Sequence, residues 1–331
     1  MFNAPAAHVS SVFVAFLLVV PASTTESSVD AAQRSPYAMV YGGRSPKART
    51  VLVYGNCQAP YLARMLATLD DLNDDYRFAA ALCYALPGEA RAPAIPDEDM
   101  KDVALLVRQY EEAQHNPALE ALTSRLPAGC PVIRYPSFNM FSQWPFEAAE
   151  TRNPHDPAYP VWKRYPLGDI LGLQIARAGL SGPLAVAAYM DLSHRKMPDL
   201  RVRLQRDIDR MQRYDAHSDV KLADYVLARF REEHLFWTSG HVSAPAMAEL
   251  ARRVAEVARP VLGGSEERAV ACLAAASHYG GMGEQQNPIH PLVAETLGLR
   301  FWEADFAYLW QTQRWTFYEY VQRYIEYDMN W

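Results

Sequence analysis

The sequence has few cysteines and no cysteine pair of the C-x-x-C type. Its 331 residues contain four cysteines, which lie far apart at Cys57, Cys83, Cys130 and Cys272. A disulfide framework or a structural zinc site needs more numerous or more closely paired cysteines. The nine histidines form no H-E-x-x-H or comparable ligand spacing. We therefore expect neither disulfides nor a metal site.

The chain also lacks an excess of positive charge. It carries 32 lysines and arginines against 38 aspartates and glutamates, which gives a formal net charge of -6. Binding to nucleic acid relies on clustered cations that neutralise phosphates, so this balance argues against a nucleic-acid partner. Half of the residues are hydrophobic, as in ordinary globular proteins. The length permits one large domain or a core with a second lobe.

An apolar run near the N-terminus, Val12–Val20, is too short for a transmembrane helix, which needs about 20 residues. No stable membrane span is therefore predicted. Pro21-Ala22-Ser23 follows the run and resembles a signal-peptidase site. A secretion signal normally carries positive charge before its apolar segment, but the first cation here is Arg34. We interpret residues 1–48 as a signal-like or disordered extension and favour a cytoplasmic location over export.

From position 49 onward, short apolar runs alternate with helical patterns. The residues between Pro60 and Leu69 place their apolar side chains on one helical face. This alternation is typical of an α/β fold, in which helices cover a mostly parallel sheet in a Rossmann-like three-layer core. The predicted strands are Thr50–Tyr54, Tyr76–Ala85, Val103–Val107 and Val132–Tyr135.

The second half of the chain has a different pattern. Residues 166–233 contain long helical patterns and predict a helical insertion or lobe. Leu235–Thr238 is a short apolar run that could return to the core, and Pro245–Leu262 predicts an amphipathic helix. We expect residues 49–165 to form the first part of the core. Residues 234–331 would complete it and end in helices rich in aromatic side chains.

The turn after the first predicted strand is the strongest candidate for chemistry. Gly55-Asn56-Cys57-Gln58 joins a strand to a helix, and ligands of open α/β sheets bind beyond the carboxyl ends of the strands. Gly55 permits a tight turn. The helix N-terminus would lower the pKa of the Cys57 thiol and favour a thiolate. Its N–H groups could instead hold a phosphate or an oxyanion, and a structural role for Cys57 stays open.

His241 is the second candidate. It follows the flexible Ser239-Gly240 pair and precedes the helix that is predicted to begin at Pro245. A histidine in such a loop can act as a general base, although many loop histidines are simply solvated.

Taken together, these segments resemble the WcbI family of capsular-polysaccharide biosynthesis proteins. Members of that family have a first strand that ends in G-N-C-Q, here Gly55-Asn56-Cys57-Gln58. They also have a later F-x-x-x-x-H-P segment, which corresponds to Phe236–His241. Val242 stands in place of the family's proline, which leaves the loop less constrained. Asp102–Gln109 resembles the family's middle strand, and the likeness extends from about Arg49 to the end of the chain.

The resemblance implies a fold related to SGNH-type hydrolases, binding of coenzyme A, and acetyl transfer during polysaccharide assembly. Acetyl-CoA or another acyl-CoA would be the donor and a saccharide the acceptor. His241 would remove the acceptor proton. Cys57 would be an acylated nucleophile or would only line the donor site.

Around the same strand ends, the candidate coenzyme-binding residues are Gly55, Asn56, Gln58 and Gln109. Neighbouring parallel strands converge there, so these groups could donate hydrogen bonds to the ligand. Glu233 and Asp191 are candidates for a third catalytic group by composition only. The phosphates of the coenzyme would need cations, for which the candidates are Arg64, Lys163, Arg164 and Arg195.

Two other functions fit the same residues. An esterase or thioesterase would use Cys57 and His241 with water in place of a sugar hydroxyl. A binding protein would keep the coenzyme pocket without turnover.

Overall fold

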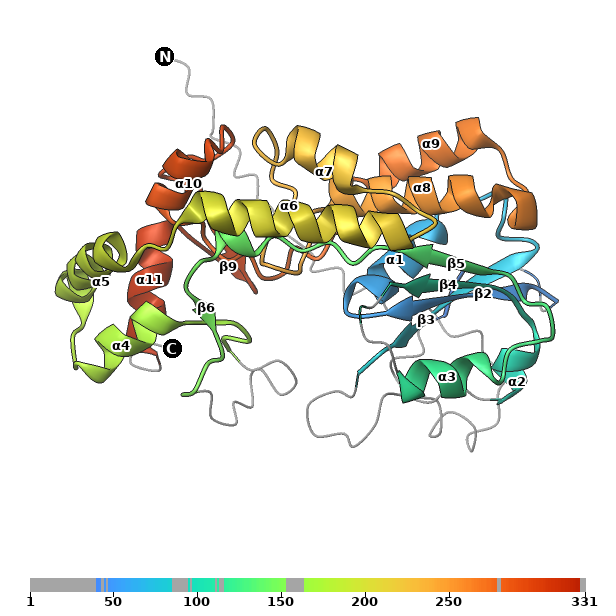
Figure 1. Ribbon diagram of the computed structural model, residues 1–331, viewed down its shortest axis with the longest axis horizontal. Helices are drawn as coiled ribbons and strands as arrows, with labels where there is room; N and C mark the ends of the chain where they lie inside the picture. Colours follow the sequence, from blue (N-terminus) through green and yellow to red (C-terminus); the bar gives the residue numbers. More distant parts are fainter. Residues whose placement is uncertain are drawn as a thin grey trace, which may run out of the picture. The chain divides into compact units, whose positions relative to one another are not determined.

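The described residues contain a five-stranded sheet, in the order β1-β3-β2-β4-β5 (Figure 1). Four of its strands run parallel, and each coincides with a run that the sequence predicted as a strand: β2 (Arg49–Gly55), β3 (Tyr76–Leu82), β4 (Val103–Gln109) and β5 (Val132–Tyr135). The predicted α/β fold with a mostly parallel sheet is confirmed. The computed structural model describes residues 40–42, 45, 47–84, 95, 97–110, 112, 116–152, 164–278 and 281–327.

The fifth strand, β1 (Val40–Gly42), pairs antiparallel with β3 at the edge of the sheet. Its residues belong to the segment 1–48 that the sequence suggested was an extension outside the core. The strand fits there because the edge of β3 offers unpaired backbone groups, and Tyr41 packs against the main apolar cluster. The run Val12–Val20 lies outside the described residues.

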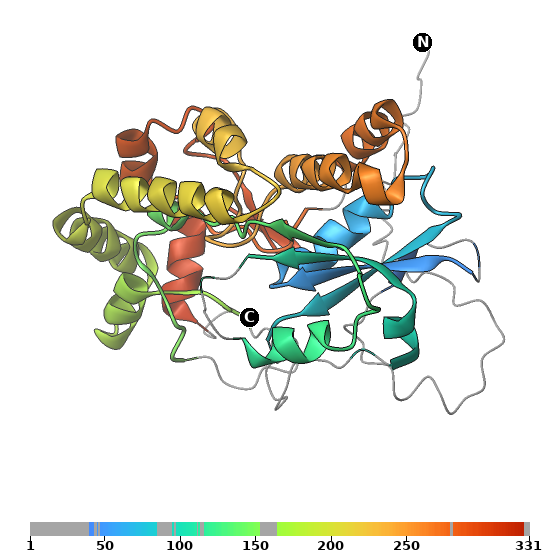
Figure 2. The ribbon, with the colours of Figure 1, turned by 45° about the vertical axis from the view of Figure 1, so that its right-hand side comes forward.

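Helices cover both faces of the sheet because its strands are apolar on both sides. Along β2, Val51 and Val53 pack with α1 and α8, whereas Leu52 and Tyr54 pack with α2 and α3. Figures 1 and 2 show α1 and α8 on one side of the strands and α3 on the other. The result is a three-layer core. Its helices are α1 (Gln58–Leu66), α2 (Asp97–Lys101), α3 (Pro117–Thr123), α8 (Ala244–Leu262) and α9 (Glu266–Ala276).

The middle of the chain is helical, but it is not packed apart from the core. The helix α6 places Leu200, Leu204 and Met211 in the main apolar cluster. The helices α4 and α5 pack with α11 (Phe317–Glu326) around a separate cluster. All described residues belong to one compact unit that spans Ser35–Trp331. The helices of this region are α4 (Ile170–Arg177), α5 (Gly182–Lys196), α6 (Leu200–His217) and α7 (Ala223–Arg229).

The aromatic C-terminal region contains a hairpin where the sequence suggested only helices. Tyr308 pairs with Trp315 across it, and Gln311 adopts a φ of 57° in the turn. Trp310 and Trp315 pack with Tyr165 in an aromatic cluster, a non-local contact that outweighs local helical preference. The region comprises α10 (Pro291–Leu297), β8 (Tyr308–Trp310), β9 (Gln313–Trp315) and α11 (Phe317–Glu326), and a short ladder joins β6 (Glu147–Ala148) to β7 (Gly168–Asp169).

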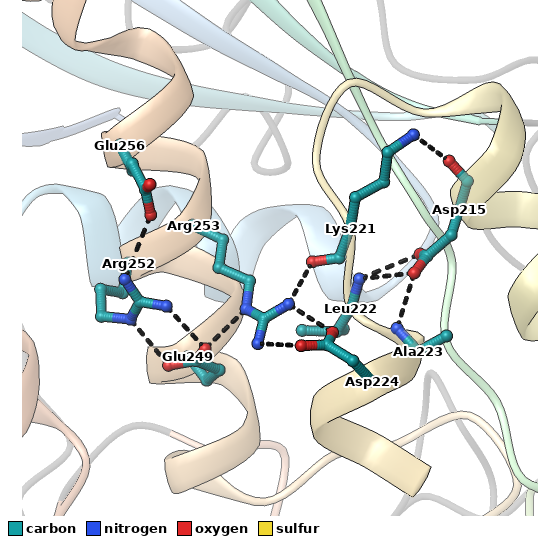
Figure 3. Close-up of polar contacts among 9 residues, drawn as sticks. All are labelled: Asp215, Lys221, Leu222, Ala223, Asp224, Glu249, Arg252, Arg253 and Glu256. Carbon is teal, nitrogen blue, oxygen red and sulfur yellow. Dashed lines mark hydrogen bonds and ion pairs between the residues drawn. The ribbon is translucent and has the colours of Figure 1, made fainter.

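Ion pairs fasten α7 to α8 (Figure 3). Arg253 on α8 contacts Asp224 on α7 at 2.5 Å and Glu249 on its own helix at 2.6 Å. Asp215, at the end of α6, accepts hydrogen bonds from the backbone N–H groups of Leu222 and Ala223, where α7 begins. These contacts hold α8, whose first residue follows the His241 loop closely in sequence.

Candidate functional site

The turn between β2 and α1 has the strand–turn–helix geometry that the sequence predicted. A side chain at Gly55 would not fit, because a Cβ atom there would lie 2.5 Å from Tyr135 Oη and 2.9 Å from Gln109 Cβ. Asn56 Oδ1 accepts the backbone N–H of Gln58 at 2.9 Å. The Asn56 side chain therefore pairs the N–H of the first residue of α1, and Cys57 is the N-cap residue of the helix.

A buried pair of glutamine side chains connects this turn to the rest of the site. Gln58 Nε2 donates to the carbonyl oxygens of Phe138 and Gly240, both at 2.9 Å. Gln58 Oε1 accepts from Gln109 Nε2 at 3.2 Å, and Gln109 Oε1 accepts the Asn56 N–H at 3.0 Å. Both glutamines are buried. With both N–H groups of the Gln58 amide occupied, these side chains hold neighbouring backbone segments in place.

The same glutamine brings the His241 loop to the turn, although 182 positions separate Gln58 from Gly240. Phe236 and Val242 form an isolated antiparallel bridge. This single bridge stands where a short strand over Leu235–Thr238 was expected. Within the loop, Thr238 Oγ1 accepts the His241 N–H at 2.9 Å. The structure thus brings the two predicted catalytic segments to the same end of the sheet.

Burial sets the protonation state of both candidate catalytic groups. It raises the pKa of the Cys57 thiol to about 11, so the thiol keeps its proton at neutral pH. The expected thiolate is not favoured, because desolvation outweighs the helix terminus and the Gln58 N–H is already bound to Asn56. Burial also lowers the pKa of His241 to about 4. Its ring is therefore neutral, and its buried Nδ1 has no hydrogen-bond partner within the described residues.

Two tyrosines lie near the Cys57 thiol. Its charged form would raise the pKa of both Tyr61 and Tyr84, in addition to the larger effect of their burial. Tyr61 Oη donates to Glu284 Oε2 at 3.1 Å, and the guanidinium of Arg64 lies 4.9 Å from the Tyr61 ring centroid. Arg64 is exposed on α1. It is the predicted phosphate-binding cation that shares a helix with the candidate site.

Most of the other charged candidates lie elsewhere. Arg195 and Asp191 form an exposed ion pair within α5 at 2.6 Å, and Glu233 pairs with an arginine four positions earlier. Arg164 is buried beside the ring of Tyr327, and Lys163 lies outside the described residues. No hydrogen bond joins either acid to His241 in the part of the chain that the structure describes. The sequence-based suggestion of a third catalytic group is not supported.

Residues 136–148, which the sequence did not point to, form hydrogen bonds that hold the His241 loop in place. The Met140 N–H donates to the Ser239 carbonyl at 2.9 Å. Ser239 Oγ donates to Glu147 Oε1 at 2.8 Å. Glu147 Oε2 is buried without a partner among the described residues, and burial raises the pKa of this carboxyl. The segment has no periodicity or motif, and only its position directly after a core strand could have pointed to it.

A serine–histidine contact elsewhere in the chain is structural. His290 Nε2 lies 2.8 Å from Ser193 Oγ, and both residues are buried. His290 Nδ1 accepts the Leu292 N–H at 3.1 Å, which places the proton of the neutral ring on Nε2. That nitrogen then donates to Ser193 and cannot remove its proton.

The described ranges contain no group of three or more His, Cys, Asp or Glu side chains that could hold a metal ion. The four cysteines are free thiols. None of the helices there is both long and apolar enough to cross a bilayer.

Fold and site together define an α/β protein whose candidate site lies at the carboxyl end of a parallel sheet, around a cysteine in a strand–helix turn. A family model described as polysaccharide biosynthesis enzyme WcbI matches residues 50–259, a range that includes both Cys57 and His241. The chain therefore belongs to the WcbI family.

A solved structure of WcbI has a similar fold. It is 17% identical in sequence, with a TM-score of 0.62, and the match covers 84% of this chain and 89% of that one. It is described as a novel polysaccharide biosynthesis enzyme, in native form without a disulfide bond between coenzyme A and one of its cysteines. No curated protein matches this chain.

Proposed function

We propose that this protein transfers an acyl group, such as acetyl, from acyl-CoA to a hydroxyl of a saccharide. The observation that carries the proposal is the hydrogen bond by which Gln58 joins the Cys57 turn to the loop of a neutral His241. Membership of a family of polysaccharide biosynthesis enzymes supports a saccharide acceptor. The association of coenzyme A with the WcbI structure supports an acyl-CoA donor. Use of acyl-CoA fits a cytoplasmic location.

In this proposal His241 is the general base. The neutral ring removes the proton of the acceptor hydroxyl as the oxygen attacks the thioester carbon. The carbon–sulfur bond then breaks, and the departing thiolate of the coenzyme takes the proton from the imidazolium. A base with a pKa of about 4 is available at neutral pH but weak. Negative charge that develops beside it in the transition state would strengthen it.

Cys57 has one of two roles in this reaction. In direct transfer, the protonated thiol lines the donor site and forms no bond. In covalent transfer, Cys57 Sγ attacks the thioester carbon, the bond from that carbon to the coenzyme sulfur breaks, and the departing coenzyme thiolate takes the proton that the Cys57 thiol gives up. The acceptor hydroxyl then attacks the acyl-cysteine, and Cys57 leaves and regains a proton from that hydroxyl. The first step requires ionisation of a thiol whose pKa burial raises to about 11. Removing the thiol proton at neutral pH costs free energy, and this cost favours direct transfer. Asn56, Gln58 and Gln109 shape the site in either case, and Gly55 allows the close turn.

Calorimetric titration of coenzyme A and acetyl-CoA into the full chain tests donor binding. We expect Arg64→Ala to weaken binding about tenfold, because an exposed guanidinium on α1 can contact a phosphate. Arg195→Ala is the matched control, since this arginine is exposed but paired with Asp191 on α5. It should leave the affinity unchanged. Absence of binding to the folded wild-type protein would reject the coenzyme assignment.

Chromatographic measurement of free coenzyme A release, with and without saccharides, tests the reaction. Acceptor-dependent release supports a transferase, whereas equal release without a sugar identifies a thioesterase. His241→Ala should lower the rate about 100-fold or more. Turnover that survives Cys57→Ala establishes direct transfer, and its loss, with coenzyme binding intact, establishes the acyl-cysteine.

A further inference from the structure

A pocket with a volume of about 550 Å³ lies beside the His241 loop, and Trp237 and Ser243 from either side of that loop line it. The backbone N–H of Trp237 donates to the backbone carbonyl of His241 at 2.8 Å. Gly283 lines the same pocket, and a Cβ atom there would lie 3.4 Å from Trp237 Nε1. The next residue, Glu284, accepts the hydrogen bond from Tyr61 on α1. The lining of the pocket is therefore connected both to the His241 loop, through Trp237, and to α1, through the residue that follows Gly283. Its volume is that of a small-molecule site.

Aromatic rings form one wall of this pocket. The rings of His234 and Trp237 are stacked, with centroids 4.8 Å apart and an interplanar angle of 24°. Phe301 lies against His234, with centroids 4.0 Å apart. All three side chains line the pocket and are only partly buried. Flat apolar surfaces of this kind can pack against the C–H face of a pyranose ring.

Unpaired polar atoms accompany these rings. Neither ring nitrogen of His234 makes a hydrogen bond of normal geometry within the described residues, nor does Ser243 Oγ. Burial lowers the pKa of His234 to about 4, against a smaller opposing effect of a weak hydrogen bond to the Phe236 backbone. The ring is therefore neutral, and the nitrogen that does not face the Phe236 backbone is left to accept a hydrogen bond from a hydroxyl group. A buried polar atom without a partner is costly, and a bound ligand with hydroxyl groups would supply the partner.

The charge of the pocket disfavours phosphates. Its described lining residues include no lysine or arginine. Two carboxylates line it, from Glu232 and Glu233, and each forms an ion pair with an arginine, so neither pair adds net charge. The lining therefore offers no unpaired cation to a phosphate, whereas the paired carboxylates can still accept hydrogen bonds from hydroxyls. A neutral polyhydroxyl ligand therefore fits better than the nucleotide end of coenzyme A.

We propose that this pocket binds one pyranose ring of the saccharide acceptor, with its C–H face on Trp237 and its hydroxyls on His234 and Ser243. The inference rests on the proposed transferase function, because it assigns the pocket to the acceptor of that reaction. It separates the acceptor site from the donor site at Cys57.

Saturation-transfer NMR on the full chain tests this assignment. The probes are the methyl glycosides of glucose, galactose and mannose, with adenosine 3′,5′-bisphosphate as the nucleotide competitor. We expect at least one glycoside to bind with millimolar affinity and the nucleotide to leave that signal unchanged. Trp237→Leu should weaken glycoside binding at least about tenfold. Ser243→Ala should weaken it about threefold to tenfold.

Ser218→Ala is the matched control, because Ser218 is also buried with an unpaired Oγ but does not line the pocket. Ser243 begins α8 without a side-chain capping bond, so its replacement leaves the helix intact. Binding of coenzyme A to each variant is measured in parallel. Loss of glycoside binding with coenzyme binding retained supports the inference, and wild-type glycoside binding without coenzyme binding would reject only the proposed donor. The inference is overturned if no glycoside binds, if both variants bind as wild type does, or if the nucleotide displaces the sugar.

Discussion

Replacement of Gln58 by leucine should destabilise the protein far more than the loss of one polar side chain normally does. The substitution leaves three groups without their partner: the carbonyls of Phe138 and Gly240 and the Nε2 group of Gln109. Each buried group left unpaired costs about 1 to 3 kcal/mol. Leucine nearly fills the space, so the cavity term is small. Since the Gly240 contact is only partly buried, we expect a total loss of about 3 to 5 kcal/mol.

Urea denaturation followed by far-ultraviolet circular dichroism measures this change. Gln143→Leu is the matched control, because Gln143 is also buried but its Oε1 accepts no hydrogen bond in the described structure. It should cost less than about 1 kcal/mol. The double variant with Gln109→Leu should cost less than the sum of the two single variants, since they share a hydrogen bond. A loss below about 1 kcal/mol for Gln58→Leu, or an equal loss for the control, would refute the role of this network.

Three further changes test other parts of the structure. Gly55→Ala should lower the free energy of unfolding in urea melts by about 2 to 4 kcal/mol, because the new Cβ would lie 2.5 Å from Tyr135 Oη. Adding Tyr135→Phe to the same chain should restore part of this loss. Equal stability of Gly55→Ala and wild type would contradict the prediction. Burial lowers the pKa of His290 from 6.5 to about 4. The stabilising contribution of the neutral ring is therefore full above pH 6.5 and falls by up to about 3 kcal/mol on acidification to pH 4. His290→Gln should reduce the dependence of the unfolding free energy on pH over this range, and an unchanged dependence would count against the prediction. Arg253→Met should cost about 1 kcal/mol through lost ion pairs, and high salt should shrink its deficit relative to wild type in the same melts.

Local patterns were enough to predict the layered core and the turn at its centre. The β-branched run before Gly55 and the proline at position 60 specify a strand, a tight turn and a helix within a few residues of one another. Patterns of this kind depend on neighbours in sequence, so they can be recognised before the chain is folded. The hairpin Tyr308–Trp315 was missed for the opposite reason. Its strands are short, and they are held by contacts with a tyrosine far away in sequence.

The chemistry of the site depends on tertiary structure. The residue types at Cys57 and His241 could be identified as candidates from sequence, but their protonation could not. Desolvation by the surrounding fold raises the pKa of one and lowers that of the other, and desolvation depends on every segment that packs around the group. The contact of Glu147 with the His241 loop could be identified only from the fold, which places its carboxylate against Ser239.

The fold class, the strand–turn–helix at Cys57 and the family resemblance could thus be predicted from the amino-acid sequence, because each depends on residues close together along the chain. The hydrogen bond that links Gln58 to the His241 loop, 182 positions away, could be found only in the folded chain. The tertiary structure also decided that the thiol is protonated and that an aromatic pocket lies beside the His241 loop. These properties arise from burial and from contacts between distant segments, which no local pattern encodes.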